Sequence, residues 1–348
     1  MSILKTGMTE LNWINWVKLL CVFFIFVNHS AIYCGVDSGI GHFYNPFFVN
    51  AFFVVSGYLF FRKYLPKQGT WADRKEWVCR GDGATLLGNV FFKILLPTLL
   101  FSALNFFPKK ILRGEEILLP DLLNDTVLGG SIWFTNALAV AELLLLLGLL
   151  FKWKRMLLFL LYGLLMACAA YGLFQCGGFV SESNVPFYYK SGMSATLLLA
   201  LGGLYWLHER TIDHIFSGWR MVLLPCLFVG YLCACRFCFS LYSGSLNLEP
   251  LNVTGLIFIV VSVYLLIRLC KALPGGRFVN YWGRHSIGIY FFCGAIPNIV
   301  AIALGKTVSL PPMVNLWLCV FLSIGMALVA VYLLNRFVPW VYDLRGRK

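Results

Sequence analysis

The sequence predicts an all-α, polytopic integral membrane bundle of about ten transmembrane helices, with both chain termini in the cytoplasm. Of the 348 residues, 60% are hydrophobic and only 12% are charged, whereas a soluble domain is nearer half apolar and a quarter charged. The mean hydropathy is +0.79. This apolar excess cannot be buried in one water-soluble core, which excludes an ordinary cytosolic enzyme, a disordered chain and a secreted disulfide scaffold.

Ten stretches are apolar over about the 20 residues that a helix needs to cross the hydrocarbon layer. They lie at 14–34, 43–61, 84–107, 132–151, 156–176, 191–207, 219–239, 251–270, 286–304 and 313–335. Because lipid satisfies no backbone hydrogen bonds, each stretch is expected to be a helix. The first has no small-residue cleavage site after a short apolar region, so we expect a retained helix. No loop is long enough for a soluble domain, and we expect one transmembrane domain over 1–348.

Basic residues fall in alternate loops, which fixes the expected orientation. The loops and tail that carry most of them are 62–83, 152–155, 208–220, 268–284 and 345–348. Positive-inside bias places these segments, and both termini, in the cytoplasm. Loop 108–131 is the exception, since it carries Lys109, Lys110 and Arg113 on the other side, together with four acids. The net charge of +13 is explained by this bias, and no basic stripe or module predicts nucleic-acid binding.

Three of the twelve cysteines form a close cluster, Cys233, Cys235 and Cys238. Such spacing is compatible with a metal site. The cluster lies within a predicted spanning helix, however, where buried cysteine behaves as a small hydrophobic residue. We favour the second interpretation, and no metal site is predicted.

His29 and Lys18 are the strongest candidates for chemistry, because ionisable groups inside a spanning helix are costly. Eleven residues at about 100° each return to nearly the same helical face, with the two side chains about 16 Å apart along the axis. Asn15, Ile25 and Tyr33 share that face, which we expect to look into the bundle.

This spacing suits a long acyl thioester of coenzyme A. A cation near the cytoplasmic mouth can hold the phosphates, and an imidazole deeper in the helix can act as general base on an acceptor hydroxyl. The alternative is a structural histidine bonded to a neighbouring helix, with Lys18 extending to lipid headgroups.

Five segments in order resemble membrane acyltransferase family 3, the polytopic O-acyltransferases of bacterial polysaccharides and related glycans. They are Lys18 with His29, FFVVSGYLFF (52–61), KILLP (93–97), IWF (132–134) and GRHSIGIYFF (283–292). The resemblance covers about residues 12–300 and agrees with ten helices. It implies a cytoplasmic acyl-CoA donor, with acetyl as the expected acyl group, a sugar or glycan acceptor, His29 as catalytic base, and a bacterial inner-membrane location.

Three other polar residues, Lys93, Glu142 and Ser56, each have two possible roles. Lys93 in the third span needs an anion or water, which a donor phosphate or Glu142 would supply. Glu142 either orients His29, as a carboxylate does in acyl-transfer triads, or serves helix-to-helix contact. Ser56 bonds a ligand or only packs beside Gly57.

Two further candidates carry charge at the cytoplasmic side. Arg62 begins a basic loop that contacts either anionic lipid or the donor phosphates. Arg284 is either an orientation anchor or a donor contact.

Departures from the family pattern affect the donor side. The family usually has Arg where Lys18 stands, and Lys lacks the bidentate fork for phosphate. It also has a further Arg upstream of Lys93, and often His where Cys293 stands.

Two alternatives stay open at this point. One is a transporter that exports a small anion or a modified saccharide, although no inverted repeat or clearly broken span is visible. The other is a non-catalytic relative that only binds or scaffolds. The acceptor and the oligomeric state are not predicted.

Overall fold

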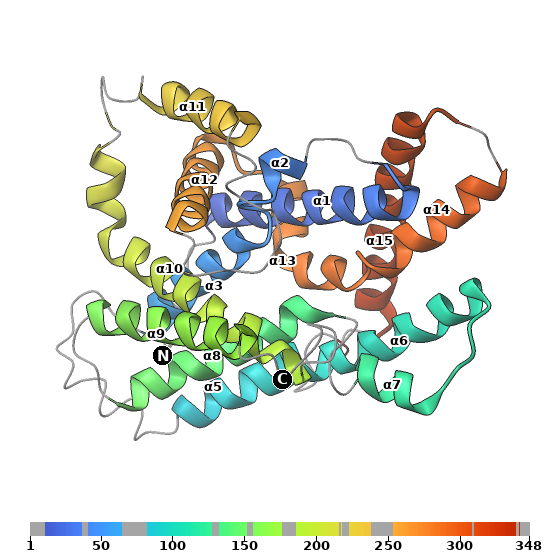
Figure 1. Ribbon diagram of the computed structural model, residues 1–348, viewed down its shortest axis with the longest axis horizontal. Coiled ribbons are helices and arrows are strands. Elements are labelled where there is room, and N and C mark those ends of the chain that lie inside the picture. The colour runs from blue at the N-terminus through green and yellow to red at the C-terminus, as the bar shows by residue number, and fades with distance from the viewer. Residues whose placement is uncertain are drawn as a thin grey trace, which may run out of the picture.

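The computed structural model is helical throughout the residues it describes, which are 11–36, 41–64, 82–126, 132–151, 156–175, 186–215, 217, 223–237, 253–307, 310–338 and 341 (Figure 1). Its helices are α1 (Asn12–Cys34), α2 (Gly41–Tyr44), α3 (Asn50–Tyr64), α5 (Asp82–Val90), the π-helix η1 (Phe91–Leu95), α6 (Leu96–Arg113), α7 (Leu119–Thr126), α8 (Trp133–Leu150), α9 (Met156–Gln175), the 3₁₀ turn η3 (Pro186–Tyr188), α10 (Tyr189–Ile215), α11 (Leu223–Phe237), α12 (Val253–Ala272), α13 (Arg277–Phe291), α14 (Ala295–Thr307) and α15 (Pro312–Phe337).

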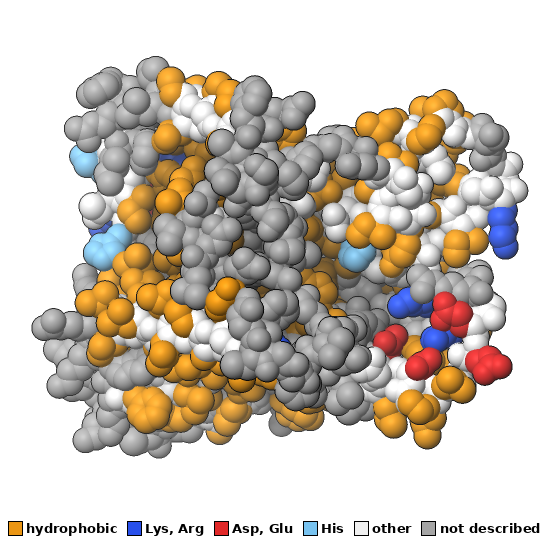
Figure 2. Space-filling model, viewed as in Figure 1, with side chains coloured by type: hydrophobic (Ala, Val, Ile, Leu, Met, Phe, Trp, Pro, Cys, Tyr) orange, Lys and Arg blue, Asp and Glu red, His pale blue; other side chains and the backbone are white. Residues whose placement is uncertain are grey.

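Five of the described helices are long and apolar enough to cross a membrane, and a bent pair raises the number to six. The five segments are Asn12–Cys34, Ala84–Ile111, Met156–Leu173, Gly255–Ala272 and Pro312–Phe337. Apolar side chains are also exposed along α9, α11 and α15 (Figure 2), as lipid contact requires. The chain is therefore a multi-pass helical membrane protein, while the count of ten spans and the side of the termini stay predictions.

The expected ninth span at 286–304 is wrong as a single helix. Its residues belong to α13 and α14, whose axes meet at 71° across a break of three residues, Phe292 to Gly294. Helix α13 also begins earlier than expected, at Arg277, so Arg284 lies two turns inside it. The second span differs as well, since α3 begins only at Asn50 and the short α2 precedes it.

A neighbouring helix supports the break between α13 and α14. The carbonyl of Phe291 accepts a hydrogen bond of 2.8 Å from the amide of Asn105 in α6. The ring of Phe101, one turn earlier in α6, stacks on the ring of Phe291 with centroids 4.4 Å apart. A broken helix in lipid is tolerated where other groups bind its freed backbone, and α6 does so here.

Helix α1 is the centre of the bundle. It packs against α3, α12, α13, α14 and α15, and runs between them in Figure 1. Only Asn12 and Ile32 of its residues are exposed. Polar side chains on α1 therefore lie inside the protein rather than against lipid.

Two glycines let α3 and α10 approach closely. A Cβ atom on Gly57 would lie 2.0 Å from the backbone oxygen of Leu199, and one on Gly202 would lie 2.0 Å from that of Val54. Any side chain at either position would force the helices apart, which is how small residues act at membrane helix interfaces. This contact explains the glycine of the FFVVSGYLFF segment.

Several helix ends meet at one end of the bundle, which we call the basic end. The Trp13 ring of α1 contacts the Tyr58 ring near the end of α3, with centroids 5.1 Å apart. Trp16 donates a hydrogen bond of 2.9 Å to the carbonyl of Pro274, just after α12, and Asn15 donates one of 3.1 Å to Asn280 at the start of α13. The start of α1, the end of α3, the end of α12 and the start of α13, which the charge pattern predicts on the cytoplasmic side, thus lie close to one another.

Candidate active site and the ion cluster beside it

His29 lies near the end of α1 that is farther from the basic end. Its ring is half-buried and stacks on the Tyr33 ring, one turn later, with centroids 6.1 Å apart. The adjacent Asn28 accepts a hydrogen bond of 3.3 Å from the Tyr44 hydroxyl of α2. The His29 side chain is thus partly enclosed within the bundle.

Lys18 occupies the same unbroken helix, closer to the basic end. It is half-buried, and regular helix geometry places it about 16 Å along the axis from His29. The structure therefore has the cation and the imidazole on one interior helix, with the cation toward the basic end.

Lys93 lies in η1, a π-helical segment that the sequence analysis did not predict. The N–H of Leu96 bonds the carbonyl of Phe91, five residues earlier. Pro97 follows, and because proline has no N–H, the ordinary helical bond to the Lys93 carbonyl cannot form. Single π turns are frequent at functional sites. The proline in KILLP was the available signal for this widened turn, on which the exposed side chain of Lys93 stands.

Glu142 is half-buried in α8 and interacts electrostatically with Lys63 near the end of α3. Helix α8 packs against α5, η1, α9 and α10. In the described residues, α1 has its main contacts with other helices, so this packing does not bring Glu142 to His29. The arrangement favours the helix-to-helix role for Glu142.

The other expected donor contacts are distributed over two helices at the basic end. Arg62 is half-buried at the end of α3, where its charge acts on the Tyr58 hydroxyl. Ser56 is half-buried in the same helix. Arg284 is exposed on α13, and the next residue, His285, has Nδ1 3.2 Å from Nδ2 of Asn335.

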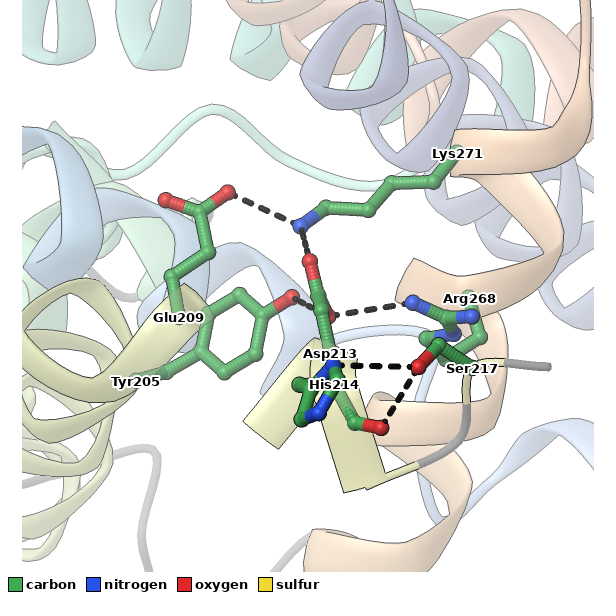
Figure 3. Close-up of polar contacts among 7 residues, drawn as sticks. All are labelled: Tyr205, Glu209, Asp213, His214, Ser217, Arg268 and Lys271. Carbon is green, nitrogen blue, oxygen red and sulfur yellow. Dashed lines mark hydrogen bonds and ion pairs between the residues drawn. The ribbon is translucent and has the colours of Figure 1, made fainter. Parts of the chain in front are cut away.

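An ion cluster that was not predicted from the sequence lies at the basic end. It joins α10 to α12 (Figure 3) and, through Tyr58, to α3. Lys271 Nζ lies 2.8 Å from Glu209 Oε1 and 2.5 Å from Asp213 Oδ2. Arg268 lies 3.2 Å from Asp213, and Tyr58 donates a hydrogen bond of 2.8 Å to Glu209. We call these five residues the ion cluster.

A sequence signal for the ion cluster did exist. The two acids are four residues apart and the two bases three apart, so that each pair shares one helix face. The two acids follow the expected span at 191–207, and the two bases lie at the end of the expected span at 251–270. The sequence does not reveal that the acidic face of α10 and the basic face of α12 lie opposite each other in the fold.

No metal site is visible in the described residues, where no three His, Cys, Asp or Glu side chains are grouped to hold an ion. Cys233 is exposed on α11, and Cys238 lies outside the described residues.

Comparison with known proteins agrees with the resemblance found in the sequence. A family model described as an acyltransferase domain, that of acyltransferase family 3, matches residues 11–336. No curated protein and no solved structure matches the chain. The match extends from the start of α1 almost to the end of α15 and includes every candidate residue above. The chain belongs to membrane acyltransferase family 3.

Proposed function

We propose that this membrane acyltransferase moves an acyl group, with acetyl the expected one, from a cytoplasmic acyl-CoA to a hydroxyl of a sugar or surface glycan. The observation that carries the proposal is the half-buried His29 on the central helix α1. The same helix bears Lys18 nearer the basic end, in a chain of an acyltransferase family.

The proposed reaction needs one proton-transfer group. His29 takes the proton of the acceptor hydroxyl as its oxygen attacks the thioester carbonyl. The carbon–sulfur bond then breaks, and the leaving thiolate takes the proton from the imidazolium. This gives an ester and free coenzyme A, and it uses no nucleophile from the protein.

Donor binding is assigned to the cations toward the basic end. Lys18 would hold a phosphate group at a distance from His29 that the long pantetheine arm can span. Arg62, Lys93 and Arg284 would add positive charge, and Ser56 a hydrogen bond. The acceptor would come to His29 from the opposite side, in a bacterial cytoplasmic membrane with the basic end in the cytoplasm.

Acyl transfer in isolated membranes tests this function. Membranes containing the protein should move label from acetyl-CoA to glycan, and membranes without it should not. Mass spectrometry of surface glycans should then find one acetyl unit fewer in cells that lack the protein. The absence of any acyl-dependent difference in both measurements would contradict the proposal.

One structural feature favours a second candidate, a transporter of an anion or a modified saccharide. The break between α13 and α14 resembles the discontinuous helices that build transporter sites. Saccharide movement into vesicles without any acyl donor would favour this function. Movement that depends on acetyl-CoA would favour acyl transfer.

A further inference from the structure

The ammonium group of Lys271 in α12 is the point at which the ion cluster contacts both α10 and α1. Lys271 Nζ contacts both carboxylates of α10, and it also lies 5.4 Å from the ring centroid of Trp13 and 5.2 Å from that of Tyr205. The side chains of Lys271, Glu209 and Asp213 are 18%, 21% and 26% exposed. Partly desolvated contacts of this kind are stronger than the same contacts in water.

The four charges of the ion cluster, Glu209, Asp213, Arg268 and Lys271, balance only when Lys271 is present. Glu209 and Asp213 face Lys271 and Arg268, with Arg62 and the phenols of Tyr58 and Tyr205 beside them. Removal of the ammonium would take from Glu209 and Asp213 the ion pairs that they make with Lys271, and it would leave Arg268 as the one cation of the ion cluster. Such an imbalance is costly, and it would draw water between α10, α12 and the first turn of α1.

The first turn of α1 connects the ion cluster to the donor. Trp13 lies five residues before Lys18, or about 7.5 Å along the helix, whereas His29 is about 24 Å away. The far end of α1 has contacts of its own, including that between Asn28 and Tyr44. A shift of the first turn would therefore displace Lys18 more than His29.

We propose that Lys271 is a positioning residue for the acyl donor, which fixes the first turn of α1 through Trp13 and thereby places Lys18. The inference rests on the proposed function, since it assumes that Lys18 holds the donor. It predicts that loss of the Lys271 ammonium weakens donor binding and leaves the chemistry at His29 nearly intact.

The test compares acetyl-transfer kinetics of Lys271→Met with those of wild type. The donor KM should rise about tenfold, which corresponds to about 1.4 kcal/mol of donor binding, while kcat stays within about twofold. Lys271→Arg, which keeps the charge, should restore most of the affinity. Lys306→Met, at an exposed lysine that ends α14, is the matched control and should equal wild type.

Chemical rescue separates positioning from a general loss of structure. Propylammonium should lower the raised donor KM of Lys271→Ala, whereas sodium at the same ionic strength should not. If Lys271 variants do not insert, Trp13→Leu is the second test. It removes the ring that contacts Lys271 and Tyr58 while every charge of the ion cluster stays, and it should also raise the donor KM.

The inference is overturned if inserted Lys271→Met has the donor KM of Lys306→Met, if kcat falls instead of affinity, or if Trp13→Leu binds the donor like wild type. These outcomes leave the proposed function standing as long as His29→Ala is inactive. Full activity of His29→Ala would instead remove the proposed function, whatever the Lys271 variants do.

Discussion

At the scale of single residues, the proposed function depends on two side chains, Lys18 and His29, whose burial costs free energy. A lysine and a histidine inside a membrane helix are retained only where a cavity or a ligand compensates their polarity. Lys18 and His29 are both half-buried on the helix that the other helices surround. Their separate positions along α1 assign them separate tasks, donor binding and proton transfer.

Replacement of Lys18 tests the donor task. Lys18→Ala should raise the donor KM by about tenfold or more, since a charge-assisted contact to phosphate contributes roughly 1.5–3 kcal/mol. Lys18→Arg should bind the donor at least as well as wild type, because guanidinium offers phosphate a bidentate fork. Acetyl transfer measured against donor concentration gives both values. Equal KM in Lys18→Ala and wild type would exclude Lys18 from the donor site.

At the scale of elements, close helix contacts position the ion cluster. Gly57 and Gly202 bring α3 and α10 together, and this approach lets Tyr58 of α3 reach Glu209 of α10. The break between α13 and α14 is likewise an interaction between elements, because Asn105 of α6 supports it.

The Gly57→Ala variant tests the α3–α10 contact. Its methyl group would overlap the backbone of Leu199, so we expect a loss of about 1–3 kcal/mol in the free energy of unfolding. Gly230→Ala is the control, because a Cβ at Gly230 of α11 meets nothing within 4 Å. That change should leave stability equal or slightly higher. Thermal unfolding in detergent measures both, and equal melting temperatures for Gly57→Ala and wild type would refute the contact.

At the scale of the whole molecule, the bundle is predicted to have its basic end in the cytoplasm. The ends of α1, α3 and α12 and the start of α13 meet there through Trp13, Trp16 and Asn15. At the α6–α7 end, Lys110 instead pairs with Glu115 at 2.9 Å and with Asp121 at 2.8 Å. The charged side chains of this end are visible in Figure 2. The basic residues that depart from the orientation rule are thus partly neutralised by local acids.

Reporter fusions test the orientation. Green fluorescent protein fused after Lys348 should fluoresce, and alkaline phosphatase fused there should be inactive, because the C-terminus is predicted in the cytoplasm. Alkaline phosphatase fused after Asp125 should be active. If both fusions give the opposite result, the predicted orientation is wrong. If only one of them does, the number of spans between the two sites differs from the prediction.

The helices could be predicted from the sequence where a long apolar run decides the matter, as it does for α1, α12 and α15. The bend after Phe291 has a partial local signal, because Gly294 lies in the break and Pro297 in the first turn after it, although the apolar run continues through both residues. Its support by Asn105, far away in the chain, could not be predicted. The same holds within the candidate site. Lys18 and His29 follow from the period of one helix, whereas the ion cluster forms because charged side chains of α10 and α12 reach each other in the folded chain.

The most direct test of the account is the activity of His29→Ala in membranes supplied with labelled acetyl-CoA. His208→Ala, at an exposed histidine of α10, is the matched control. We predict that His29→Ala, inserted in normal amounts, loses acetyl transfer by a factor of about 10² or more, as loss of a general base entails, and that His208→Ala transfers acetyl like wild type. Undiminished transfer by the inserted His29→Ala variant would contradict the account.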